Sequence, residues 1–383
     1  MKAEIPDLAT VLNKQAKPLI SYIWKTALTE PVVKFIGKKK LLKIECASES
    51  RSGSIIVDAN LKQDGVAYLM ASSLVNIKSS HKKAIISVTD DKMTITSDSK
   101  ARKLKIQINL VGSDTYLKHK TGSKEITAGE LGKIDLEYLQ KAIGKIAISP
   151  ILVPGVDFAL LTMTPFEEKG FRIYINDGLR VSMIEIPKSK IVIKEPFATD
   201  FGELNDIIAV MSSITDKASL IFTNKSMVVK GMNEAGENIA LIKTNHSVPK
   251  DEKGIRARTA VENAQKQSMK MSFIPNEDFV EVLENVIGIA NLKSNQGFLD
   301  IAVKKTGLTI SGSGPSTSYN ESMQLKKVKG TGIVRIQGSV LSDIARKLGG
   351  KSLVKVNANG IVINNREKNA DIFFVLPFLS LKQ

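Results

Sequence analysis

One pattern of hydrophobic residues repeats six times along the chain, at a period of roughly 65 residues. Each repeat opens with apolar residues at the three- and four-residue spacing of an amphipathic helix and continues with β-rich segments. The first helix is predicted over residues 8–27, interrupted at Pro18. Further helices are predicted after Asp64 (Val66–Leu74), after Asp135 (Leu136–Ile143), at Leu204–Met211, after Asn276 (Phe279–Ile287) and at Val340–Leu348.

Three strands are expected after each helix. They are Val32–Ile36, Leu41–Cys46 and Ser54–Ala59; Ala84–Val88, Met93–Ser97 and Leu104–Leu110; Phe158–Met163, Phe171–Ile175 and Arg180–Ile186; Ala218–Thr223, Ser226–Met232 and Ile239–Thr244; Phe298–Val303, Leu308–Gly312 and Met323–Lys327; Leu353–Ala358, Gly360–Asn364 and Ile372–Pro377. The pattern predicts an α+β fold built from helix-plus-β-meander units.

One helix covers a strand meander poorly, so neighbouring units should pair. Six units then make three similar domains. The polar, glycine- and lysine-rich stretches Gly112–Gly132 and Asn245–Ser268 read as linkers between them. The predicted domains are residues 1–120, 126–250 and 268–383.

The charge of the chain favours a polyanionic partner, and nucleic acid is the commonest. The net charge is +16, with 22 Lys and Arg against 12 Asp and Glu in residues 1–125. Residues 126–265 carry −1 and residues 266–383 carry +7. The alternative is that the lysines only keep the surface soluble.

Neither a catalytic site nor a metal site is predicted. No His, Cys and carboxylate residues stand at metal-ligand spacing, and no phosphate-binding loop is present. The one cysteine, Cys46, lies in an apolar run typical of a half-buried strand, and no histidine is near it in sequence. We therefore expect no enzyme activity and no cofactor, although a nuclease built on scattered carboxylates is an open alternative.

No apolar run reaches the length of a membrane span, and Met1–Pro6 lacks the features of a signal peptide. A lone cysteine cannot form an internal disulfide, so nothing requires an oxidising compartment. The expected location is the cytoplasm, of a bacterium or of an infected host cell.

Two segments carry a family resemblance. Residues 175–182 read Ile-Asn-Asp-Gly-Leu-Arg-Val-Ser, similar to the Thr-Asp-Gly-His-Arg-Leu-Ala turn of one clamp family, although a plain Asn-Asp-Gly turn explains them too. The last predicted strand ends in Leu376-Pro377-Phe378, similar to that family's terminal Met-Pro-Met. With six helix-plus-meander units, the chain resembles the DNA sliding clamps of the bacterial DNA polymerase III beta subunit type.

The resemblance implies a non-enzymatic processivity factor that closes a ring around duplex DNA as a head-to-tail homodimer. In the family the helices line the hole, which here implies DNA contacts from Lys14, Lys17, Lys25, Lys78, Lys82, Lys83, Lys141, Lys145, Arg346 and Lys347. The fifth predicted helix is acidic, so the first domain should supply more of the DNA contacts than the last domain. A solvated surface explains each single lysine as well as a DNA contact does.

The resemblance also implies a pocket for short apolar peptides of the polymerase and the clamp loader, between the middle and last domains. When the family's pocket is carried over position by position, the pocket of this chain would comprise Leu161, Asn176, Gly178, Leu179, Val181, Phe374, Leu376, Pro377 and Phe378. The alternative is that these residues belong to the core.

The sequence departs from the family in its basicity and in residues 1–60, which match least. Two interpretations follow. One is a divergent clamp, for example a phage-encoded one. The other is an open or monomeric basic factor that holds DNA by electrostatics alone.

Overall fold

The computed structural model describes residues 1–382 apart from 79, 100–101, 118–128, 148–159, 177–179, 190, 216, 244–251, 267–269, 276–277, 290–297, 315–316, 348–351, 358–359, 368–369 and 377–379. The chain divides into two compact units. Unit 1 comprises residues 1–140, 191–194 and 202–247, and unit 2 comprises residues 141–190, 195–201 and 248–383. Because the units share residues 126–250 between them, the three predicted domain boundaries stay a prediction.

Unit 1 contains two antiparallel sheets. The five-stranded sheet has the order β5 (Asn60–Gln63), β1 (Lys2–Ile5), β7 (Ala84–Val88), β8 (Lys92–Ser99) and β9 (Arg102–Asn109). The nine-stranded sheet has the order β14 (Val192–Ile193), β10 (Glu130–Asp135), β16 (Lys217–Thr223), β17 (Ser226–Asn233), β18 (Gly236–Lys243), β4 (Arg51–Val57), β3 (Leu41–Ala47), β2 (Val32–Lys38) and β6 (Gly65–Met70). Strands β18 and β4 join the fourth repeat to the first, with Ile239 opposite Ser54.

The first helical segment of unit 1 is irregular where the sequence predicts an interruption. It consists of α1 (Leu8–Thr10), a π-helical stretch (Val11–Ala16) and α2 (Lys17–Trp24), with Pro18 at the start of α2. Asp7 caps the first turn, because its carboxylate accepts the backbone N–H of Thr10 at 3.0 Å. Leu8, Leu12, Leu19, Ile20 and Ile23 are buried against the sheets, as the helical spacing predicts.

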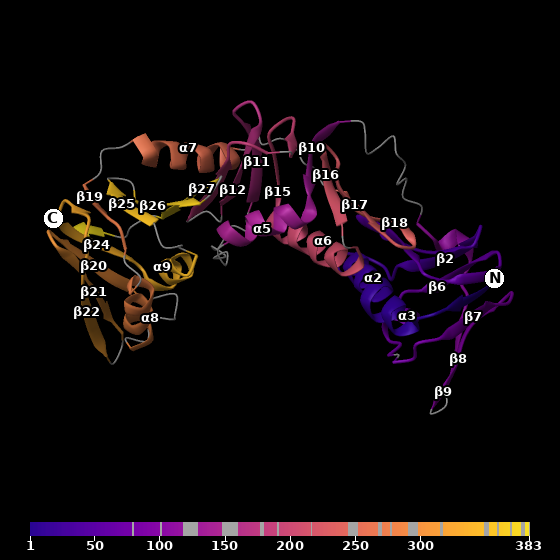
Figure 1. The fold of residues 1–383 in the computed structure, drawn as a ribbon. Helices are drawn as coiled ribbons and strands as arrows, with labels where there is room; N and C mark the ends of the chain where they lie inside the picture. Colours follow the sequence, from indigo (N-terminus) through magenta and orange to yellow (C-terminus); the bar gives the residue numbers. More distant parts are fainter. Residues whose placement is uncertain are drawn as a thin grey trace. The chain divides into compact units, whose positions relative to one another are not determined.

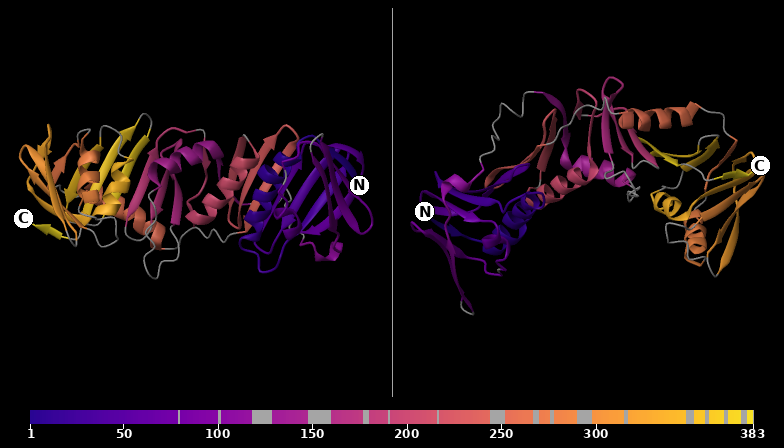
Figure 2. Two further views of the ribbon diagram at one scale, coloured as in Figure 1. Left: turned by 90° about the horizontal axis from the view of Figure 1, so that it is seen from below. Right: turned by 180° about the vertical axis from the view of Figure 1, so that it is seen from behind.

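The other helical elements of unit 1 are the short α3 (Ser72–Val75), a 3₁₀ turn (Ser113–Thr115) and α6, which starts at the unit boundary (Phe201–Ile214). Helix α5 (Leu136–Ile146) contains the other boundary between the units, and Asp135 accepts the backbone N–H of Tyr138 at 3.0 Å. Within unit 1, α2 and α6 lie side by side in Figure 1 and in the left view of Figure 2.

Unit 2 repeats the arrangement of two antiparallel sheets. Its nine-stranded sheet has the order β15 (Phe197–Asp200), β11 (Leu160–Phe166), β12 (Gly170–Asn176), β13 (Val181–Ile186), β27 (Ala370–Leu376), β26 (Gly360–Glu367), β25 (Ser352–Asn357), β19 (Met271–Phe273) and β23 (Val328–Lys329). Its five-stranded sheet has the order β22 (Ser318–Gln324), β21 (Gly307–Ser313), β20 (Phe298–Lys304), β24 (Gly332–Gln337) and β28 (Ser380–Lys382).

Three helices belong wholly to unit 2. Helices α8 (Phe279–Ile289) and α9 (Gly338–Ala345) pack together, and α8 also packs on β21 and β22. Helix α7 (Glu252–Lys266) packs on β12, β13, β26 and β27 and lies along a face of their sheet in Figure 1 and in the right view of Figure 2. The described residues thus confirm the predicted α+β class and most of the predicted strands.

Two sequence predictions are wrong. The helix predicted after Asp64 is strand β6 over Gly65–Met70, because Ala67 and Leu69 pair with β2 and only Ser72–Val75 is helical. The stretch Asn245–Ser268, predicted as a linker, contains the packed helix α7. The other predicted linker, Gly112–Gly132, falls largely outside the described residues.

Candidate nucleic-acid interface and partner pocket

The predicted DNA-contacting cations of unit 1 differ in what they touch. Lys14, Lys78 and Lys82 are exposed, and within the described part of the chain none of the three makes an ion pair. Lys17 is half-buried, and its Nζ donates to the carbonyl oxygen of Ile77. Burial and then the charge of Lys78 lower the pKa of Lys17. Lys17 therefore links α2 to the segment after α3, and its ammonium group is less available to a partner than those of the exposed lysines.

The segment that follows α3 is held against the first helix. The backbone N–H groups of Leu8 and Ala9 donate to the carbonyl oxygens of Lys82 and His81, at 2.5 and 3.0 Å. The Thr10 N–H and, to a smaller extent, the Lys82 and Lys14 charges lower the pKa of Asp7, against the opposing effect of burial. These hydrogen bonds bring Lys14 into the same region of unit 1 as Lys78 and Lys82, although more than 60 positions separate them in the sequence.

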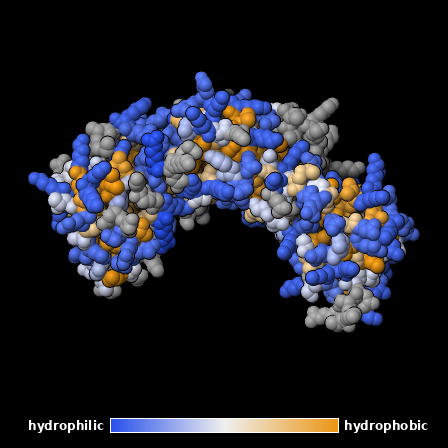
Figure 3. Space-filling view, viewed as in Figure 1, coloured by the Kyte–Doolittle hydropathy of each residue, from blue (hydrophilic) through white to orange (hydrophobic). Residues whose placement is uncertain are grey.

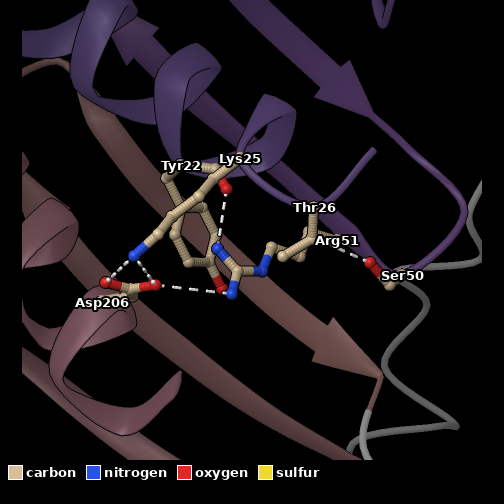
Figure 4. A network of polar contacts seen from close by, with 6 residues as sticks. All are labelled: Tyr22, Lys25, Thr26, Ser50, Arg51 and Asp206. Carbon is tan, nitrogen blue, oxygen red and sulfur yellow. Dashed lines mark hydrogen bonds and ion pairs between the residues drawn. The ribbon is translucent and has the colours of Figure 1, made fainter. Parts of the chain in front are cut away.

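A polar network joins α2 to α6 (Figure 4). Lys25 Nζ lies 2.9 and 2.8 Å from the two carboxylate oxygens of Asp206, and Arg51 Nη2 lies 3.5 Å from the nearer of these. Arg51 Nη1 also donates to the Tyr22 carbonyl oxygen at 2.9 Å, and the guanidinium lies 4.7 Å from the centre of the Tyr22 ring. Asp206 thus offsets much of the positive charge of Lys25.

Burial distinguishes the members of this network. Only 3% of the Arg51 side chain is exposed, against 62% for Lys25 and 27% for Asp206. Burial also raises the pKa of Tyr22 well above its usual value. Sequence reasoning missed Arg51, Tyr22 and Asp206, because nothing local marks residues from two different repeats as neighbours.

In unit 2 the predicted cations mostly hold partners. Arg346 Nε lies 2.8 Å from Glu284 Oε1 and joins α9 to the acidic α8. Lys347 Nζ donates to the carbonyl oxygen of Gly144 in α5 at 2.9 Å, and burial lowers its pKa. Lys141 is exposed and Lys145 half-buried. The acidic character predicted for the fifth helix is present as Glu281 and Glu284.

The two segments predicted to form the partner pocket lie on adjacent strands. Val181 in β13 stands opposite Val375 in β27, and Asn176 in β12 stands opposite Val181. Gly178, Leu179, Pro377 and Phe378 lie outside the described residues. The structure therefore brings both predicted walls into one sheet, although almost 200 residues separate them.

The described pocket residues divide between the two faces of that sheet. Leu161, Phe374 and Leu376 are at most 2% exposed, and strand alternation puts Phe374 on the face opposite to Val181. A partner can touch side chains so deeply buried only if their neighbours move.

Helix α7 covers the face that carries Val181. Its Val261 packs into a cluster with Tyr174, Val181, Met183 and Phe373, and Ala260 and Val375 lie against the same cluster. The buried Asn357 amide donates to the Ala264 carbonyl oxygen at 3.0 Å and so ties the helix to β25. The alanines and valine at helical spacing in 257–264 were the sequence signal that could have identified this helix.

The described residues offer neither a metal-binding group nor a membrane-spanning helix. No group of three or more His, Cys, Asp or Glu residues there could hold a metal ion, and no helix there is long and apolar enough to cross a membrane. Cys46 is buried in β3, and burial raises its pKa to about 12. A thiol with so high a pKa is a poor nucleophile near neutral pH.

No family model and no curated protein matches the sequence of this chain. The solved structures that match include the beta sliding clamp of C. crescentus, at 15% identity, 99% coverage of each chain and a TM-score of 0.77.

Two further matches agree with it. The Helicobacter pylori beta clamp in complex with carprofen shares 13% identity, covers 99% of this chain and 100% of its own, and gives a TM-score of 0.76. A putative DNA polymerase III beta subunit of Eubacterium rectale shares 14% identity, with the same coverage and TM-score. The predicted resemblance is confirmed at the level of fold, because the whole chain has the fold of these clamps.

Proposed function

We propose that this chain is a DNA sliding clamp, a processivity factor that encircles duplex DNA and tethers a replicative polymerase. The observation that carries the proposal is the fold match to beta clamps, which covers 98–99% of this chain. A chance likeness of one domain would not extend over both units and all the repeats. A clamp acts by tethering, so the proposal requires no catalytic group.

The exposed lysines of unit 1 support contact with DNA. A sliding protein must attract phosphates without reading bases, and lysine contacts phosphate as a mobile, hydrated point charge. Lys14, Lys78 and Lys82 have this character. Lys17 and Lys347 are held by backbone carbonyls, so we assign them a smaller part in DNA binding than the sequence predicts.

We infer that the ring consists of two copies joined head to tail, because a heterologous contact either closes a ring or grows a filament. Unit 2 exposes Ile289, at 49%, and a second copy would cover apolar surface of this kind. Figure 3 agrees that apolar patches lie among mainly hydrophilic residues on the visible face.

For the polymerase and the clamp loader we propose docking at the sheet of β12, β13 and β27, through short apolar peptides. Val181 and Asn176 are the described residues of that site nearest to its surface. Because α7 covers Val181, a peptide that reaches it has to compete with α7. We also propose a cytoplasmic location, while a phage source stays a prediction.

The proposal is tested by mass and by topology. Light scattering of a ring should give twice the 41.7 kDa chain mass at both low and high salt. Protein allowed to bind a nicked circular plasmid should then resist a high-salt wash and should leave when a restriction enzyme opens the circle.

The second candidate is an open or monomeric basic factor held by electrostatics, which the net charge of +16 favours. It predicts a monomer mass and equally steep salt-dependent loss from linear and circular DNA. That pair of results would overturn the ring.

A further inference from the structure

Unit 1 contains a pocket of about 950 Å³ whose lining includes Lys83 but no other residue predicted to contact DNA. Its floor comes from strands β1, β7, β8 and β9 of the five-stranded sheet, three of which are labelled side by side in Figure 1. The turn at Lys40 and residues 58–60 form a further wall. The volume is at the upper end of the range usual for ligand sites, roughly 300–1,000 Å³.

A single row of side chains crosses the floor. Lys105 stands opposite Thr96, Thr96 opposite Ile85, and Ile85 opposite Glu4. Residues opposite each other in antiparallel strands point to the same face and lie within contact range. Ile85 is 36% exposed in the middle of this polar row, which makes it an apolar contact point.

The rim of the pocket has an excess of positive charge. Lys40, Lys83, Lys103 and Lys105 line it and are exposed, and none of them makes an ion pair with a described residue. The Glu4 carboxylate already lies 3.5 Å from Lys62 Nζ, which does not line the pocket. Asp58 is the one other lining carboxylate, so four cations face two anions, one of them already paired.

The wall at residues 81–84 is fixed in place. The Ser97 hydroxyl donates to the carbonyl oxygen of Lys83 and lies 3.2 Å from His81 Nδ1. The His81 and Lys82 carbonyls in turn accept the N–H groups at the start of α1. A site formed in advance loses less entropy on binding than one that must be ordered by its ligand.

We propose that this pocket binds an acidic peptide segment of a partner protein, with one large apolar side chain placed against Ile85 and its carboxylates beside the rim lysines. A free anion would leave the exposed Ile85 side chain uncovered. A DNA duplex offers phosphates spread over a broad surface and has no group to bury against Ile85. The proposal does not involve the peptide site in unit 2; because β9 is an edge strand of its sheet, the mass of the Lys103 and Lys105 variant is also measured.

The test uses the full-length chain and a fluorescein-labelled ten-residue peptide of Asp and Glu with a central Leu-Phe pair. Fluorescence polarisation at physiological salt should show saturable binding. The double variant Lys103→Glu/Lys105→Glu should weaken it at least tenfold, and Ile85→Ser about fivefold. The matched control Lys92→Glu/Lys225→Glu makes the same charge change at exposed lysines of unit 1 outside the pocket, and should change it less than twofold.

Four outcomes would overturn the proposal. Equal weakening by both double variants, or equal binding of a peptide with Ser-Ser in place of Leu-Phe, would mean non-specific attraction to a basic protein. Displacement of the peptide by a short DNA duplex, with a parallel loss of DNA affinity in Lys103→Glu/Lys105→Glu, would make this a nucleic-acid surface. A change of mass in that variant would make it a contact between copies. Circular dichroism of each variant separates these outcomes from misfolding.

Discussion

The predicted DNA-contacting cations of the two units differ in what they touch. In unit 1, Lys14, Lys78 and Lys82 face solvent without an ion pair among the described residues. In unit 2, Arg346 pairs with Glu284, and Lys347 is held by the Gly144 carbonyl. Net charges of +10 for residues 1–125 and +7 for residues 266–383 suggest a smaller contrast. The comparison teaches that a count of charges does not describe the field that a nucleic acid meets.

The two units also hold their helices in place through different kinds of interaction. In unit 1 a buried guanidinium, Arg51, links α2 to α6 through Asp206. In unit 2 an apolar cluster fastens α7 to the sheet, and Phe374 fills the opposite face. Each mode predicts its own response to substitution.

The largest effect is expected at Phe374 in unit 2. Its side chain is fully buried, so Phe374→Ala should lower the free energy of unfolding by about 4 kcal/mol, measured by urea denaturation. Phe298→Ala is the matched control in the same unit, because that ring is 42% exposed and should cost less than 1 kcal/mol, roughly. Similar small losses for both variants would assign Phe374 to an open pocket and not to the core.

The polar link of unit 1 should come next. Arg51→Met should destabilise the chain by about 3 kcal/mol, because it leaves the Tyr22 carbonyl without its donor and breaks a largely buried ion pair. Lys25→Met removes the other cation of the same carboxylate, but at 62% exposure it should cost at most about 1 kcal/mol. Equal losses in thermal or urea unfolding would contradict the distinction between the two cations.

Local periodicity predicted much of the fold. Helices α5, α6 and α8 and most strands lie where the spacing of apolar residues puts them. Residues 65–70 were misassigned because Val66, Leu69 and Met70 also fit helical spacing, and pairing with β2 decides between the two structures. Pairings between repeats, such as β18 with β4 and β13 with β27, leave no local mark in the sequence.

The candidate sites were less predictable than the fold. Sequence spacing identified Lys14, Lys78 and Lys82 but could not tell them from Lys17, whose ammonium group is tied to Ile77 by tertiary packing. Sequence spacing likewise could not show that Val181 and Phe374 lie on opposite faces of one sheet, because that depends on how β13 pairs with β27.

DNA binding tests the contrast between the units directly. Lys78→Gln/Lys82→Gln should weaken binding to a 30-base-pair duplex about 30-fold and reduce the slope of log affinity against log salt by about 2, since each lost phosphate contact removes about 0.9. Arg346→Gln/Lys347→Gln removes the same charge from unit 2 but should weaken binding less than fivefold, because both cations already hold partners. The reverse order would mean that unit 2 carries the DNA track.

The smallest effect belongs to Cys46, the one cysteine of the chain, in β3 of unit 1. Burial raises its pKa from 9.0 to about 12, so the folded chain keeps a proton that the unfolded chain releases above pH 9. The contribution to stability is therefore complete below pH 9 and declines as the pH rises toward 12, by about 1.4 kcal/mol at pH 10. Urea unfolding of the natural chain should show this decline between pH 8 and 10, and Cys46→Ala should lack it.

Because unit 2 holds no thiol, labelling of Cys46 also reports on unit 1 alone. If unit 2 loses its structure at a urea concentration where Cys46 stays unlabelled, the two units unfold separately. The contrast between the units would then extend from charge to stability.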